Sequence, residues 1–131
     1  MPGIDECLLE TMRLPGALGA ALVDWTSGLA LGTIGDSPGG DHEAAAAETA
    51  EFARCAAEHP VFLPGTADTS GRLPPLEDVF VATHEGYHLL RFVRTAHDSS
   101  IFLYLWLDPE LGNLALARMR LRELAERLVL A

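Results

Sequence analysis

Two histidines and a glutamate near residue 85 match a zinc-protease pattern. His84, Glu85 and His88 stand in the order His-Glu-x-x-His, which binds zinc when a helix brings both histidines to one face beside the glutamate. Here these residues lie between two β-rich runs, with Gly86 in the middle, so a hairpin turn is expected instead of a helix. No third ligand stands at an obvious position downstream. We therefore expect no metal and no peptidase activity.

A second pattern matches the nucleophile elbow of hydrolases. Residues 35–39 read Gly-Asp-Ser-Pro-Gly, and they fall between an expected strand and an expected helix. In that elbow the residue after the serine donates its backbone N–H to the oxyanion. Pro38 follows Ser37 and has no backbone N–H, so a required donor is missing. We interpret the segment as a loop and predict that the protein is not an enzyme.

The other residues with chemical potential stand apart from one another. The chain has no phosphate-binding, dinucleotide-binding or Cys-x-x-Cys motif, so we expect no cofactor. We interpret His42, His59 and His97 as surface or capping residues. Cys7 and Cys55 both lie in helix-like segments, and we expect two reduced thiols.

Charge and length restrict the class of protein. Nine arginines, no lysine and nineteen acidic residues give a net charge of −10 over 131 residues, and such a field repels nucleic acids. The chain begins without a signal-like segment and has no apolar run that could span a membrane, so we expect a cytoplasmic protein of one domain, residues 1–131. The lack of lysine beside abundant alanine and arginine is typical of a high-GC bacterial genome.

Hydrophobic periodicity predicts the order helix, two strands, helix, three strands, helix. The expected helices cover residues 4–14 and 42–58 and a C-terminal segment that begins at Asp108; the expected strands cover 17–23, 29–34, 78–83, 87–93 and 101–107. Residues 101–107 have no polar face, which indicates the central strand, whereas Gly32 indicates a peripheral one. The long segment 61–75 is expected to be an irregular loop. The order predicts an α/β (α+β) sandwich with one five-stranded, mainly antiparallel sheet.

One segment carries a family motif. Residues 15–24 read Pro-Gly-Ala-Leu-Gly-Ala-Ala-Leu-Val-Asp and residues 28–31 read Gly-Leu-Ala-Leu, and this hairpin resembles that of the Roadblock/dynein light chain family. The order of elements also fits. The segment 61–75 is longer than is usual in the family, and the last helix is more basic. The resemblance implies a Roadblock/profilin-like fold, no active site, and a homodimer in which second helices pack together and third strands pair.

The residues favour a homodimer independently of the resemblance. An edge strand at 78–83 would present Val79 and Val81 on an apolar edge without lysine or proline, which is a liability unless a partner strand pairs with it. The second helix carries a stripe of small side chains that would let another backbone approach closely. These predicted interface residues are Ala46, Ala50, Ala53, Ala57, Val79 and Val81. Packing of the alanine stripe onto the chain's own sheet is the alternative.

Two hypotheses for function follow. The resemblance implies a regulator of a Ras-like small GTPase or a related signalling partner, and Arg118 and Arg122 on the last helix are candidate partner contacts, with a solvated helix face as the alternative. The second hypothesis is a small-molecule sensor with a pocket between sheet and helix, lined by the long loop with Trp25 and Tyr87.

Overall fold

The structure is a computed structural model that describes residues 3–62, 76–94 and 100–128. Its elements in chain order are α1 (Ile4–Thr11), β1 (Ala17–Asp24), β2 (Leu29–Gly35), the 3-10 turn η1 (Pro38–Gly40), α2 (His42–Glu58), the 3-10 turn η2 (Pro60–Phe62), β3 (Asp78–Thr83), β4 (Gly86–Val93), β5 (Ile101–Leu107) and α3 (Leu114–Arg127). This order confirms the prediction of three helices and five strands in an α+β fold.

All five strands form one antiparallel sheet in the order β2-β1-β5-β4-β3. The strand β5 lies at the centre, because a strand with no polar face needs neighbours and a covering layer on both sides. The sheet ends at β2 on one side and at β3 on the other. Both the central position of residues 101–107 and the peripheral position of the Gly32 strand were predicted correctly.

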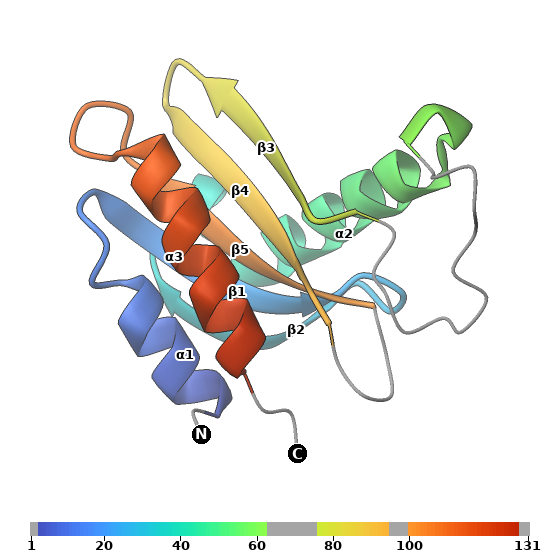
Figure 1. Ribbon diagram of the computed structural model, residues 1–131, viewed down its shortest axis with the longest axis horizontal. Coiled ribbons are helices and arrows are strands. Elements are labelled where there is room, and N and C mark those ends of the chain that lie inside the picture. The colour runs from blue at the N-terminus through green and yellow to red at the C-terminus, as the bar shows by residue number, and fades with distance from the viewer. Residues whose placement is uncertain (1–2, 63–75, 95–99, 129–131) are drawn as a thin grey trace.

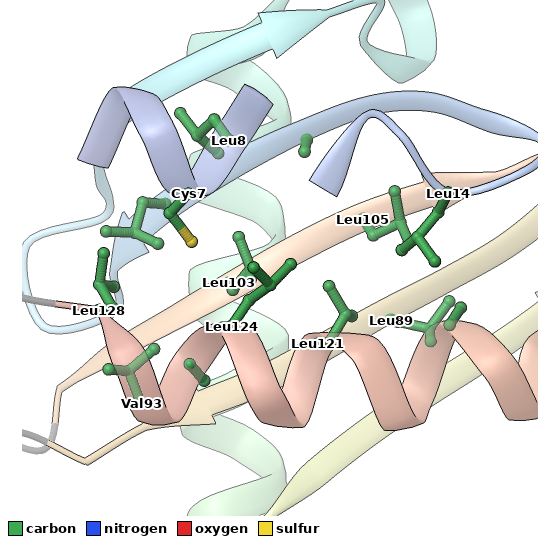
Figure 2. Close-up of a cluster of buried hydrophobic side chains, with 14 of the residues drawn as sticks. Cys7, Leu8, Leu14, Leu89, Val93, Leu103, Leu105, Leu121, Leu124 and Leu128 are labelled. Atoms are coloured by element: carbon green, nitrogen blue, oxygen red, sulfur yellow. The ribbon is translucent and has the colours of Figure 1, made fainter. Parts of the chain in front are cut away.

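The helices cover both faces of the sheet (Figure 1). Helices α1 and α3 pack side by side on one face, and α2 lies on the opposite face over β1 and β2. The larger core cluster fills the space under α1 and α3. There, Leu103 and Leu105 of β5 lie among Leu121 and Leu124 of α3 and Cys7 of α1 (Figure 2). A second cluster around Phe92 and Phe102 lies on the α2 side.

Two helix boundaries differ from the prediction. Helix α1 ends at Thr11 instead of Leu14, where Pro15 and the positive φ of Gly16 force a turn. Helix α3 begins at Leu114, not after Asp108, because the Asn113 side chain accepts the N–H of Leu116 as the N-cap.

Asp108 instead caps an isolated turn ahead of α3. Its Oδ1 accepts the N–H groups of Glu110 and Leu111 at 2.8 and 2.9 Å, and its backbone oxygen accepts the N–H of Gly112. The Asp-Pro-Glu sequence therefore has the capping chemistry that was expected, but the chain leaves the turn before it continues as a helix. Most of the expected loop 61–75 and the residue His97 lie outside the described residues.

Candidate interaction surface

The edge strand β3 exposes apolar side chains. It lies at one end of the sheet, as the sequence analysis supposed for residues 78–83, and among the described strands it pairs only with β4. Val79 is half-buried, whereas Phe80 and Val81 keep 44% and 37% of their surface exposed. The register against β4 runs without a shift over the whole strand, so no bulge interrupts this edge.

The backbone of β3 offers hydrogen-bonding groups on its open side. The N–H of Phe92 in β4 donates to the oxygen of Glu77 at 3.0 Å, and bonded pairs in an antiparallel ladder recur at every second residue. Val81 therefore directs its backbone groups toward β4, whereas Phe80 and Ala82 direct theirs away from the sheet. A further strand could accept and donate hydrogen bonds there.

The opposite edge of the sheet is built differently. Strand β2 contains a β-bulge, because Leu22 and Val23 of β1 pair with Gly32 and Ala30 and leave Leu31 without a partner. Gly32 is packed under α1, where a Cβ atom would come within 2.7 Å of the Ile4 side chain. Bulges are one of the devices that protect a sheet edge from pairing. Of the two edges, β3 is the one that the described residues leave without such protection.

An apolar groove lies beside β3. It has a volume of about 570 Å³ and runs between β3 and the C-terminal half of α2. Phe52 of α2 and Phe62 of η2 are 42% and 58% exposed at this groove. Its lining residues are Phe52, Cys55, Ala56, His59, Val61, Phe62, Leu76, Asp78, Val79 and Phe80. The open strand edge and this groove together form what we call the β3 surface.

The four alanines of the predicted interface face the chain's own sheet and do not line the β3 surface. Ala46, Ala50 and Ala53 are buried against the chain's own sheet, and Ala57 is 8% exposed at the end of the same stripe. The close approach that small side chains allow is therefore made to the chain's own strands. The exposed part of α2 that borders the groove is carried by Phe52, Cys55 and Ala56 instead, which the sequence analysis missed. The position of Phe52 off the alanine stripe was the signal in the sequence that could have identified them.

The two arginines predicted as partner contacts have different surroundings. Arg118 donates to both carboxylate oxygens of Asp78 on β3, and its guanidinium lies 5.1 Å from the ring centroid of Phe80. The Asp78 hydrogen bonds raise the pKa of Arg118. Arg122 makes an exposed contact with Glu126, with Nε and Oε1 3.4 Å apart. Arg118 thus ties α3 to the first residue of β3 through hydrogen bonds, while the Arg122 side chain remains exposed.

The two catalytic patterns do not form catalytic geometry. His84 and Glu85 form the turn of the β3–β4 hairpin, and His88 lies within β4, so no helical face holds the two histidines together. Among the described residues, no group of three or more histidine, cysteine, aspartate and glutamate side chains could hold a metal. The Ser37 hydroxyl, in the loop before α2, contacts the oxygen of Pro38 at 3.4 Å.

His88 instead joins an aromatic cluster on the α2 side of the sheet. Its Nδ1 lies 2.8 Å from the Tyr104 hydroxyl, and its ring is nearly parallel to those of Tyr104 and Trp106. Burial lowers the pKa of His88 and raises the pKa of Tyr104. The neutral imidazole is therefore the favoured form of His88.

The aromatic residues considered for a ligand pocket lie on opposite faces of the sheet. Trp25 packs edge-on against Phe92 in the cluster under α2, whereas Tyr87 packs against the cluster under α1 and α3. They do not line one pocket. Cys7 and Cys55 are both free thiols, the first buried and the second exposed. Within the described ranges, none of the helices combines the length and the apolar character that crossing a bilayer requires.

Comparison of the sequence with models of known protein families and with curated proteins finds no match.

Proposed function

We propose that the protein is a non-catalytic homodimer in which the β3 surface of each copy covers that of the other. The carrying observation is the unprotected edge of β3 beside an apolar groove. Pairing of two β3 strands would satisfy the outward backbone groups of Phe80 and Ala82. The same contact would remove the exposed phenylalanines of the groove from water, and such burial is the main driving force of association.

The groove also indicates how two copies would fit. Phe52 and Phe62 project from α2 and η2 on the side of the molecule where β3 is open. In a dimer with a twofold axis, both copies use the same surface. The β3 edge of one copy therefore faces the β3 edge of the other, and the two grooves also face each other. The interface then consists of Val79, Val81 and the groove residues of α2, with the alanine stripe supporting α2 from below.

We further propose that this dimer regulates a Ras-like small GTPase or a related signalling protein in the cytoplasm. Support comes from the resemblance of residues 15–31 to the Roadblock hairpin and from the matching order of elements. The dimer would act by favouring one conformation of the GTPase switch loops, without contributing to the chemistry of hydrolysis.

A pull-down tests the partner. The purified dimer is incubated with the small GTPase encoded nearest in the genome, loaded in turn with GDP and with a non-hydrolysable GTP analogue. Stronger retention of one nucleotide state is the expected result. No retention in either state would refute the GTPase hypothesis, while a dimer found in the same preparation would leave the interface proposal standing.

A further inference from the structure

Three arginine side chains converge where β3 begins. Arg91 lies in β4, Arg94 directly follows that strand, and Arg122 reaches the same place from α3. They line a cavity of about 530 Å³. The remaining lining residues are Leu76, Glu77, Phe92, Ala125 and Glu126. On a chain with a net charge of −10, this is a cavity with three arginines in the lining, and a second such cavity, between α1 and α3, has Arg13, Arg120 and Arg127.

Arg91 has no acceptor for its inner N–H. Its Nε is buried and has no hydrogen-bond partner among the described residues. The acid directly across the ladder is Asp78, but both oxygens of Asp78 already accept from Arg118, at 2.7 and 3.0 Å. Buried donors normally have a partner because an unpaired one is costly. The fold therefore leaves a cavity-lining arginine with a buried donor that has no acceptor in the described part of the chain.

The other two arginines are also weakly engaged. Arg94 is exposed and forms no ion pair with any residue that the structure describes. Arg122 has only its exposed contact with Glu126, and such surface pairs contribute little to stability. Glu77 and Glu126 reduce the charge of the lining from +3 to +1. We therefore expect binding of an anion there to be sensitive to salt.

The number of donors indicates the kind of anion. The Arg118–Asp78 pair in the same protein illustrates that one guanidinium occupies both oxygens of a carboxylate. Three guanidinium groups can serve more acceptors than one carboxylate offers. A phosphate monoester has three terminal oxygens that accept hydrogen bonds. Its charge near neutral pH is about −1.5 to −2, as for a phosphorylated side chain.

We propose that this cavity binds the phosphate group of a phosphorylated ligand. Arg91 is the inner anchor, and Arg94 and Arg122 bind the phosphate at the mouth of the cavity. The site shares Leu76 with the β3 surface but none of the residues that we assign to strand pairing. It does not depend on the proposed dimer or on its GTPase partner.

Titration calorimetry with phenyl phosphate, and with benzoate as the carboxylate control, tests the proposal. We expect phenyl phosphate to bind the wild-type protein and benzoate to bind more weakly. Arg91→Gln and Arg122→Gln are each expected to weaken phenyl phosphate binding about tenfold or more, since each removes a charge-assisted hydrogen bond. Arg120→Gln is the matched control, because Arg120 lies on the same helix but lines a different cavity, between α1 and α3.

A second arm identifies the source of the phosphate. The protein is sedimented with phosphatidylcholine vesicles that either contain or lack a phosphatidylinositol phosphate. The phosphate belongs to a lipid headgroup if the protein binds only the vesicles with the phosphorylated lipid and if this binding falls in Arg122→Gln. Absence of binding to both probes would overturn the proposal. Equal loss in Arg120→Gln, or equal affinity for benzoate, would also overturn it, because general charge attraction would then suffice. Arg122 is exposed, so Arg122→Gln should fold. If Arg91→Gln does not fold, the loss of phenyl phosphate binding in Arg122→Gln tests the proposal.

Discussion

Arg118 in α3 holds Asp78, the first residue of β3, through two hydrogen bonds, from Nε to Oδ2 at 2.7 Å and from Nη2 to Oδ1 at 3.0 Å. Helix α3 packs chiefly on β4, and the Arg118–Asp78 pair also connects this helix to the edge strand β3. The guanidinium also covers the ring of Phe80. The open edge on which the proposed dimer depends is therefore held in position by α3, which lies on the face of the sheet opposite to α2.

Loss of this pair should loosen β3. The Asp78 side chain is only 15% exposed, so in Arg118→Gln its carboxylate loses a charged partner in a partly buried place. We expect the free energy of unfolding to fall by about 1–2 kcal/mol. Arg118→Lys should recover only part of the loss, because a lysine cannot donate two parallel hydrogen bonds. Urea denaturation measures the effect, and unchanged stability in Arg118→Gln would contradict this role.

Gly19 should tolerate no side chain. A Cβ atom there would collide with the backbone oxygen of Asp36, where the chain leaves β2, and the N–H of Asp36 bonds to the oxygen of Leu18. We expect Gly19→Ala to reduce the free energy of unfolding by about 1–3 kcal/mol, the usual range for overpacking. Gly3→Ala is the control, because a Cβ at Gly3 meets nothing within 4 Å. Thermal melts measure the midpoint of unfolding of both variants. Equal midpoints for Gly19→Ala and Gly3→Ala would contradict the prediction.

His88 should make the protein less stable in mild acid. Burial lowers the pKa of His88 in the folded state below the ordinary histidine value of 6.5, so the unfolded chain takes up a proton first as the pH falls. The stabilisation that comes from the neutral form is complete above pH 6.5 and is lost as the pH falls through the folded pKa. His88→Phe keeps a ring but cannot titrate, so its urea midpoint should fall less than that of the wild type between neutral pH and mild acid. Parallel pH curves for the two proteins would contradict the prediction.

A lysine on the open edge should separate the proposed dimer. Val81→Lys places a charge beside the backbone groups with which a second strand would pair, and edge lysines are a common means of preventing such pairing. We expect the dimer dissociation constant to rise about tenfold or more. Leu31→Lys is the matched control, since Leu31 has a similar exposure of 43% on the protected edge β2. Sedimentation velocity compares the two, and equal effects would remove β3 from the interface.

Local chemistry made most of the fold predictable from the sequence. Asp41, which caps α2 through two backbone N–H groups, and the uninterrupted apolar run of β5 are signals within a few residues of the elements that they define. The start of α3 was mistaken because Asp108 and Asn113 have equivalent capping chemistry, and only the packing on the sheet decides which one the helix uses.

The candidate surface was less predictable than the fold. The sequence analysis supposed an edge position for Val79 and Val81 without a local signal that fixes it, and the structure has β3 at the end of the sheet. Whether the alanine stripe faces the sheet or a second copy depends on the rotation of α2. That rotation is set by contacts with β1 and β2, far away in the sequence. The groove at Phe52 and the arginine cavity at Arg91 likewise bring together elements that no local pattern connects.

The oligomeric state of the wild-type protein tests the central claim most directly. Light scattering coupled to gel filtration should give twice the 14.1 kDa mass of the chain, with the mass falling toward one copy on dilution. Ala82→Pro removes one outward N–H of β3 without removing a bond to β4, so it should shift the mass toward 14.1 kDa while the circular dichroism stays native. A wild-type protein that has the mass of one copy at every working concentration would contradict the account.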